Sequence, residues 1–199
     1  MSRSPHTRFG KYLALGMLCA AVVAVAGCGG DGGDESGSPP PDYAKLLDGS
    51  PPPLAGLHRQ GDQLLGGGRP AFEERLEQLN GFPAVVNVWA SWCGPCRAEF
   101  PHFQKVGSEL GRKVAFIGVD SDDDRDSAMT FLDSNPVPYP SYSDPDKEIA
   151  TALGATLGFP ATAFFDSEGN QTHIRHGPYA TSAELEADVR RFAIDGESG

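Results

Sequence analysis

The stretch that decides the fold is NVWASWCGPCRAEFP, Asn87–Pro101. It places Cys93 and Cys96 with two residues between them, directly after the apolar run Ala84–Ala90. A run of that length and character is typical of a buried strand. The proline between the cysteines suits the first turn of a helix, where a backbone N–H has no intrahelical partner. The pattern therefore predicts a buried strand, a turn that carries Cys93, and a helix from Pro95 to Leu110.

A Cys-x-x-Cys pair can bind a metal, crosslink the chain or exchange disulfides. A structural zinc site needs four ligands, but the sequence has no second such pair, and only His102 follows closely, with His173 and His176 far along the chain. A crosslink between residues three apart closes a loop too small to add much stability through chain entropy. Redox exchange is therefore the predicted use, with no metal and no cofactor.

Cys93 is expected at the amino end of the helix, where free N–H groups and the helix dipole stabilise an anion. This environment lowers the pKa of a thiol, and the thiolate is the nucleophile in disulfide exchange. We therefore expect Cys93 to attack and Cys96, one turn further on, to resolve the mixed disulfide. Trp92 is either a lid over the pair, where it would meet substrate, or ordinary packing.

The rest of the chain alternates between strand and helix patterns. Helices are predicted at 69–81, 124–135, 145–155 and 181–194, and strands at 113–120, 161–166 and 171–176, the last two joined by a turn. Strand-helix-strand units make neighbouring strands parallel, and a hairpin adds an antiparallel edge. The predicted class is α/β, with a central mixed sheet flanked by helices. A further hairpin is expected within 54–68, and a stiff proline-rich loop at 134–140.

The acidic run DSDDDRD, Asp120–Asp126, resembles the start of a calcium-binding loop. An EF-hand loop needs glycine at its sixth position and an acid at its twelfth, where this chain has Arg125 and Phe131. The run is better interpreted as a strand end followed by an acidic helix start. Asp120 is retained as a candidate contact for substrate.

Residues 1–27 are predicted to be a secretory signal, because basic residues precede the uncharged apolar run Tyr12–Gly27. The run is shorter than the roughly 20 residues of a membrane-spanning helix. VAGC, Val25–Cys28, resembles a bacterial lipobox, which implies cleavage before Cys28 and lipid on its sulfur. The alternatives are an uncleaved anchor, or ordinary cleavage that leaves Cys28 as a free thiol. All three export the domain.

Residues 28–53 are predicted to be a flexible tether, because glycine, serine, proline and acids cannot bury enough apolar surface to fold. The folded domain is expected over 54–195, and 199 residues suit one domain. The net charge of −11 argues against nucleic acid as a partner.

The quoted stretch resembles a thioredoxin-fold active site, in which WCGPC is followed by a proline, here Pro101. It is most similar to the exported branch related to TlpA and ResA, which are membrane-tethered thiol-disulfide oxidoreductases. GFPAT, Gly158–Thr162, matches a second motif of that branch, and the resemblance covers about 54–192. It implies a thioredoxin fold with an N-terminal extension and an insertion between a helix and a strand.

The resemblance also implies roles for individual residues. Pro160 matches the family's cis-proline, and the backbone before it, at Phe159, would hold an extended substrate. Glu99 matches a catalytic glutamate that would tune the cysteines and handle a proton. The alternatives are an ordinary trans proline and a solvated helix carboxylate. Asn87 stands where cytosolic thioredoxin has a buried aspartate, so that proton relay is absent here.

These features imply an extracytoplasmic disulfide reductase of exported proteins, anchored by Cys28 to the outer face of the bacterial cytoplasmic membrane. Apocytochrome c is a candidate substrate, because the ResA-like branch reduces it before haem attachment. A membrane thiol-disulfide electron-transfer protein would recharge the pair, and a monomer is expected. A disulfide-forming oxidase is the main alternative. A thiol peroxidase is disfavoured by Ala90, where peroxiredoxins have threonine, and a non-catalytic binding module by the intact cysteine pair.

Overall fold

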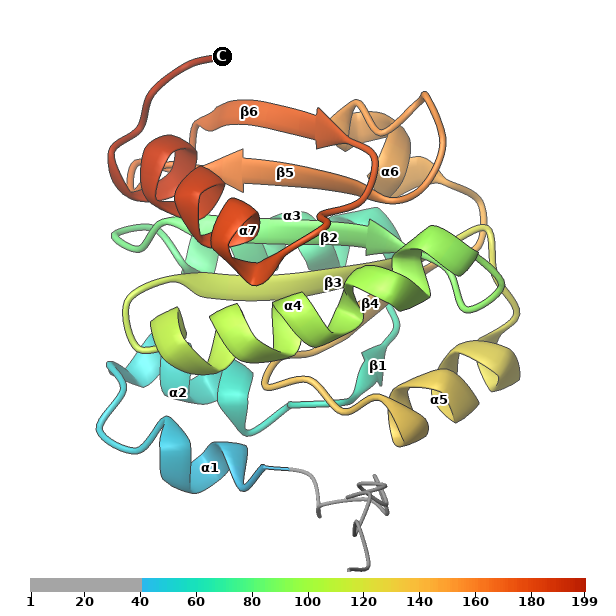
Figure 1. Cartoon of the computed structure of the whole chain (residues 1–199), viewed down its shortest axis with the longest axis horizontal. Helices are drawn as coiled ribbons and strands as arrows, with labels where there is room; N and C mark the ends of the chain where they lie inside the picture. Colours follow the sequence, from blue (N-terminus) through green and yellow to red (C-terminus); the bar gives the residue numbers. More distant parts are fainter. Residues whose placement is uncertain (1–40) are drawn as a thin grey trace, which may run out of the picture. The chain divides into compact units, whose positions relative to one another are not determined.

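The computed structural model describes residues 41–199, which contain a six-stranded sheet with helices on both faces (Figure 1). The order of strands across the sheet is β1-β4-β3-β2-β5-β6. In chain order the strands are β1 (Leu64–Leu65), β2 (Ala84–Trp89), β3 (Ala115–Ser121), β4 (Ser141–Asp144), β5 (Ala161–Phe165) and β6 (Gln171–His176).

The sheet is mixed, as predicted. β2 lies parallel to β3 and antiparallel to β5, while β3–β4 and β4–β1 are parallel pairs. β5 and β6 form the predicted antiparallel hairpin, which contains a β-bulge between Phe164 and Phe165. β2 is therefore a central strand, and its carboxyl end opens into the turn that carries the cysteines.

Helices cover both faces of this sheet. They are α1 (Tyr43–Leu46), α2 (Pro52–His58), α3 (Gly68–Gln78), α4 (Gly94–Leu110), α5 (Arg125–Ser134), α6 (Glu148–Leu153) and α7 (Ser182–Asp188), which continues as a π-helix (Val189–Ile194). Side chains of α4, α5, α7 and the π-helix share one apolar core with the sheet. Side chains of α2, α3 and α6 share the other.

Alternation along β2 decides which side chains face the active-site helix. Val85 and Trp89 belong to the core on the α4 side, whereas Val86 and Val88 belong to the opposite core. Successive side chains of a strand point to opposite faces, so Asn87 shares the α4 face with Val85 and Trp89. All six residues of β2 are buried, which fixes its register against the core.

The hairpin predicted within 54–68 is wrong. The segment contains α2 and then the two-residue strand β1, which pairs in parallel with β4 instead of folding back on itself. The prolines at 52 and 53 suit the first turn of a helix, and Leu54 and Leu57 are buried on one side of it. Helical spacing of these two leucines was the signal that the prediction overlooked.

Strand β4 was not predicted from the sequence. Ser141–Asp144 reads SYSD, a short polar run that follows two prolines, so neither composition nor alternation marks a strand. It is held on both sides, by β3 and by β1. β4 and α6 occupy the chain between α5 and β5, where the sequence predicted an insertion.

Part of the predicted tether packs on the domain. The Tyr43 hydroxyl donates to the Pro136 carbonyl at 2.9 Å, and Leu47 is buried. The packed chain therefore begins before residue 54. None of the helices within 41–199 has the length and apolar character required to cross a membrane.

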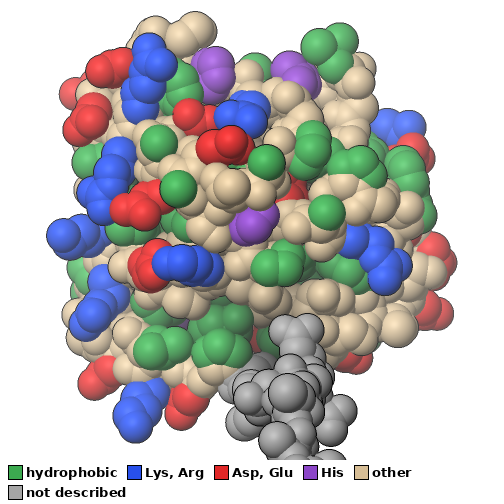
Figure 2. All heavy atoms as spheres, viewed as in Figure 1, with side chains coloured by type: hydrophobic (Ala, Val, Ile, Leu, Met, Phe, Trp, Pro, Cys, Tyr) green, Lys and Arg blue, Asp and Glu red, His purple; other side chains and the backbone are tan. Residues whose placement is uncertain are grey.

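The surface that Figure 2 shows carries acidic and basic side chains next to one another rather than in separate patches. Elsewhere in the fold, charged side chains form exposed ion pairs one helical turn apart, such as Lys105–Glu109 on α4 and Glu186 on α7 with Arg190 in the π-helix. Exposed pairs of this kind add only about 0.3–0.5 kcal/mol each to stability.

Candidate active site

The two cysteines lie where β2 ends and α4 begins, as predicted, and they form a disulfide. Cys93 is the N-cap residue of α4, and its Sγ accepts a hydrogen bond from the Cys96 backbone N–H at 3.2 Å. Sulfur thus takes the place that a serine or aspartate oxygen has in an ordinary cap. α4 is 17 residues long, so its dipole acts on the Cys93 sulfur.

Burial separates the roles of the two cysteines. Cys93 is 4% exposed, whereas Cys96 is 0% exposed and belongs to the core beneath α4. A protein disulfide can therefore approach Cys93 but not Cys96. In the reduced state the helix end favours a thiolate on Cys93. The geometry is that of an attacking cysteine with a resolving cysteine behind it.

The Phe159–Pro160 peptide bond is cis, as predicted. Strand β5 starts at the next residue, Ala161, which pairs with Val88 near the end of β2. This pairing places the backbone of Phe159 at the end of the sheet where β2 leads into the cysteines. Phe159 itself is half-buried and touches both apolar cores.

Trp92 lies on the surface and is not part of the core. Its side chain is 60% exposed, and its indole N–H donates to the Asp122 carbonyl at 2.9 Å. Its ring centroid lies 6.1 Å from that of Phe159. A pocket of about 340 Å³ is lined by both rings, together with Asp122 and Lys147. Trp92 is therefore not a core residue, and its role as a lid over the cysteine pair stays a prediction.

Glu99 is fully buried, so the alternative of a solvated helix carboxylate is wrong. It lies three residues after Cys96, hence on the same buried side of α4. Its Oε1 accepts from the Asn87 side-chain amide at 2.9 Å, and its Oε2 accepts from the Tyr179 backbone N–H at 3.1 Å. Asn87 thus anchors the carboxylate from β2, because strand alternation turns it toward α4.

Burial raises the pKa of Glu99 to about 7. The hydrogen bonds from Tyr179 and Asn87 and the positive charge of Arg175 favour the ionised form, but they do not offset the desolvation. The group therefore gains and loses a proton close to neutral pH. The Asn87 side-chain oxygen, Oδ1, accepts no hydrogen bond from a donor among residues 41–199.

The sequence did not reveal the contribution of the chain after β6. Tyr179 reaches Glu99 through its backbone N–H, which any residue except proline could supply. Its ring is held by Arg175, whose guanidinium lies 4.2 Å from the ring centroid, and by a hydrogen bond from its hydroxyl to Asp188. No residue type marks such a contact in a single sequence.

The acidic loop after β3 holds Ser91 and Trp92, the two residues before Cys93, through hydrogen bonds. The Ser91 backbone N–H donates to the Asp123 carboxylate, and Trp92 donates to the carbonyl of Asp122. The Asp122 carboxylate in turn pairs with Lys147 at 2.6 Å. Asp120, retained only as a candidate contact for substrate, is 1% exposed and so does not reach the surface. Cys28 lies outside the described residues.

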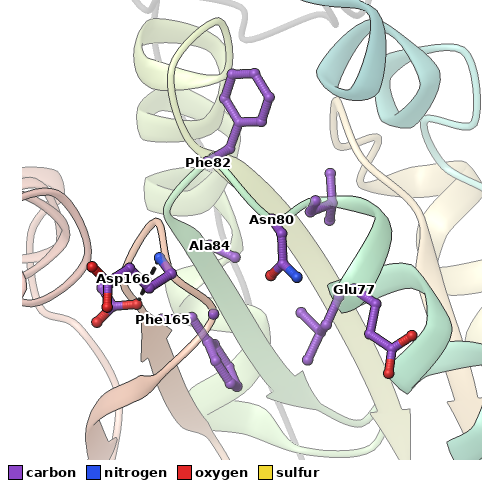
Figure 3. Close-up of a pocket in the computed structure, with 10 residues that line it drawn as sticks. Glu77, Asn80, Phe82, Ala84, Phe165 and Asp166 are labelled. Carbon is purple, nitrogen blue, oxygen red and sulfur yellow. Dashed lines mark hydrogen bonds between the residues drawn. The ribbon is translucent and has the colours of Figure 1, made fainter.

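A separate pocket of about 200 Å³ lies away from the cysteines (Figure 3). Its walls come from the end of α3 and the residues after it, from Ala84, the first residue of β2, from Phe165, the last residue of β5, and from the turn that begins at Asp166. Ala84 and Cys93 flank β2 at opposite ends, and a strand of this length spans roughly 20 Å. This pocket takes no part in the cysteine site.

Solved structures support the arrangement. MTB dsbF in its mixed oxidized and reduced forms matches with a TM-score of 0.53 at 32% identity, over 57% of this chain and 82% of that one. A secreted Mycobacterium tuberculosis disulfide oxidoreductase homologous to E. coli DsbE gives a TM-score of 0.50 at 26% identity, over 57% and 84% of the two chains. These matches confirm the predicted thioredoxin-like fold.

Curated relatives carry the name thiol:disulfide interchange protein DsbE. That of Allochromatium vinosum is 39% identical over 118 residues, which cover 57% of this chain and 64% of the relative. That of Pseudomonas aeruginosa is 37% identical over 108 residues, which cover 54% and 56%. The chain thus spans less than two thirds of the length of these relatives. The Redoxin family model matches residues 73–189, more than half of the chain, and the chain therefore belongs to the Redoxin family.

Proposed function

We propose that this chain is a thiol-disulfide oxidoreductase of the TlpA/ResA-like branch that reduces disulfides in exported proteins. The observation that carries the proposal is the burial pattern at the start of α4: a barely exposed Cys93 at the helix end, with Cys96 and Glu99 fully buried behind it. Relatives named as thiol:disulfide interchange proteins support exchange as the activity.

The reaction starts from the reduced pair. The Cys93 thiolate attacks one sulfur of a substrate disulfide, forms a mixed disulfide and releases a substrate thiolate, which takes a proton from solvent. Cys96 then loses its proton and attacks the Cys93 sulfur. This step forms the Cys93–Cys96 disulfide and releases the second substrate thiolate. Two electrons pass from the pair to the substrate, and the state with the closed disulfide is the product.

Glu99 is proposed to handle the proton of Cys96. The carboxylate lies one turn beyond Cys96 on the same buried side of α4, and its pKa of about 7 lets it accept a proton near neutral pH. A surface carboxylate, ionised well below pH 7, would be a weaker base for a thiol. Asn87 and Tyr179 hold Glu99 in place through its two oxygens.

The substrate is proposed to bind on the surface beside Cys93 that is formed by Trp92, Phe159 and the cis bond before Pro160. Trp92 supplies an exposed ring beside the sulfur, and the pocket between the two rings offers room for a side chain. Backbone groups at Phe159 would hold an extended segment, as an edge strand does. Apocytochrome c is the candidate substrate, and a membrane thiol-disulfide electron-transfer protein is the candidate donor.

The order of the two cysteines can be tested with a synthetic peptide that contains one disulfide. Cys96→Ser is expected to accumulate a covalent peptide adduct on Cys93, because the resolving thiol is gone. Cys93→Ser is expected to form none and to lose exchange, because Cys96 is buried. Intact mass spectrometry before and after dithiothreitol would measure both. An adduct on Cys96 in the Cys93→Ser variant would reverse the assignment.

The direction of electron flow can be tested by equilibrating the protein with glutathione buffers. If the protein is a reductase, its reduction potential is expected to lie closer to that of thioredoxin, about −270 mV, than to that of the oxidant DsbA, about −120 mV. The Gly-Pro spacer shared with thioredoxin favours this outcome, and Ala90, where peroxiredoxins have threonine, counts against a peroxidase. A potential near that of DsbA would establish the oxidase instead, and peroxide consumption by the reduced protein would establish a peroxidase.

Replacing Glu99 with glutamine should change the pH dependence of exchange. Single-turnover reduction of the same peptide between pH 5 and 9 is expected to show an inflection near pH 7 in the wild type, and none there in Glu99→Gln. Because folding raises this pKa from 4.5, the group stabilises the fold at low pH, and that stabilisation is lost as the pH rises through about 7. Denaturant unfolding at several pH values should show a larger loss in the wild type than in Glu99→Gln, where the raised pKa of Asp120 still contributes its own loss.

Glu109→Gln is the matched control for Glu99. Glu109 is an exposed carboxylate on the same helix, paired with Lys105. Its replacement should leave both the pH–rate profile and the pH dependence of unfolding as they are. If Glu99→Gln also retained the inflection near pH 7, Glu99 would have no part in the proton transfer.

We also propose that lipid on Cys28 holds the domain at the outer face of the cytoplasmic membrane. The support is the VAGC sequence at the end of an apolar run, followed by a segment rich in glycine and proline. Cys28→Ala is expected to move the protein from the membrane fraction to the soluble fraction when the cells are broken. Retention of Cys28→Ala in the membrane would point to an uncleaved N-terminal anchor.

A further inference from the structure

Asp120 is a buried acid that the exchange mechanism does not use. It lies at the end of β3, in register with Trp89 at the end of β2, and is 1% exposed. Neither of its carboxylate oxygens accepts a hydrogen bond from a donor within residues 41–199. Buried carboxylates usually have such partners, so this one needs an explanation.

The group that faces Asp120 is another carboxylate, that of Asp123. Asp123 is half-buried and accepts the backbone N–H of Ser91, two residues before Cys93. Two ionised carboxylates only repel each other, so the one attraction available between them is a shared proton. Burial, contact with Asp123 and the charge of Asp144 raise the pKa of Asp120 to about 8, against the opposing charge of Arg125.

The other charged groups around Asp120 are already bound to other partners. Asp144, on β4, accepts from the Ser121 hydroxyl and from two backbone N–H groups at the start of α6. Arg125 donates to the carbonyl of Leu64 at 2.9 Å. Lys147 pairs with Asp122. None of these groups satisfies Asp120.

On the side of β2 and α4, no described residue donates a hydrogen bond to Asp120 either. The Trp89 indole N–H donates to the Ser141 hydroxyl at 3.2 Å. The Arg97 guanidinium lies over the Phe131 ring, 5.6 Å from its centroid. Among the described residues, no three His, Cys, Asp or Glu side chains are grouped so that they could hold a metal ion.

We propose that Asp120 and Asp123 share one proton, and that this pair positions the Ser91–Trp92 segment in front of Cys93. Asp120 fixes Asp123, and Asp123 holds the Ser91 N–H. Trp92, the next residue, is held by the same loop through the Asp122 carbonyl. The pair therefore connects the end of β3 to the rim of the cysteine site.

Loss of the shared proton to solvent leaves two facing negative charges. Repulsion then moves Asp123 away from Asp120, and its hold on Ser91 weakens. Trp92 loses its fixed place beside Cys93, so disulfide exchange is expected to slow at alkaline pH. This last consequence rests on the proposed function, whereas the shared proton does not.

The shared proton can be tested by NMR on the full-length ¹⁵N-labelled chain with its cysteine pair oxidised, so that neither active-site thiol titrates. The Ser91 amide resonance is expected to shift between pH 6 and 10 with a midpoint near 8. Asp120→Asn should abolish this transition, because its amide donates permanently to Asp123 and cannot ionise. Asp126→Asn, an exposed acid of the same run, and Glu99→Gln should both retain it.

Asp123→Asn provides a second test that leaves the buried Asp120 in place. Removing the facing charge is expected to lower the midpoint by about one pH unit or more. An unchanged midpoint in this variant, a transition that persists in Asp120→Asn, or no transition in the wild type would each overturn the inference.

Peptide reduction by the same variants separates this inference from the proposed function. Wild-type exchange should fall between pH 8 and 9.5 relative to that of Asp120→Asn. If exchange had the same pH dependence in the two proteins, the Asp120–Asp123 pair would have no effect on the active site, even if the two carboxylates share a proton. A Ser91 transition in a protein that exchanges no disulfide would instead contradict only the proposed function.

Discussion

The chemistry of this protein depends on one hydrogen bond, from the Cys96 N–H to the Cys93 sulfur at the start of α4. A helix leaves its first N–H groups without intrahelical partners, and a sulfur placed there is stabilised as an anion. β2 delivers Cys93 to that place because the strand is buried on both faces and cannot slip in register. A one-residue slip would turn Asn87 away from α4, and Glu99 would lose the partner on its Oε1.

Two buried acids flank this site in different states. Glu99 accepts two hydrogen bonds, so its ionised form is partly compensated and its pKa lies at about 7. Asp120 accepts none, and with a second carboxylate facing it its pKa is raised to about 8. Burial therefore leaves Glu99 able to accept and release a proton near neutral pH, whereas Asp120 stays protonated to a higher pH. Hydrogen-bond partners decide the difference.

Local signals in the sequence were enough for the centre of the site. Cys93, Cys96 and the helix that follows them could be placed from an apolar run and a proline, and Pro160 from its flanking motif. Glu99 was named from the family resemblance with a solvated carboxylate as the alternative, and its burial in the structure decides between the two. The predicted cap, strand and hairpin near these residues are all present. Each depends on contacts between residues close in sequence or on a strong pattern.

Other parts depend on contacts that a single sequence does not encode locally. β4 is a strand only because β1 and β3 flank it, and its polar residues carry no strand pattern. Tyr179 joins the site through a backbone N–H, and Asp123 through an acceptor that any of several neighbouring acids could have supplied. The hairpin expected at 54–68 failed because two leucines at helical spacing outweighed the turn-forming glycines.

The two outer strands of the sheet bear on how the protein would meet the substrate proteins proposed for it. β1 has two residues, and β6 pairs with β5 across a β-bulge and carries histidine and arginine side chains. Edge strands that are short, bulged or charged offer an unfolded chain few backbone groups for strand pairing. A protein proposed to meet such chains at its cysteines can therefore release them after exchange, since its sheet does not seed their aggregation.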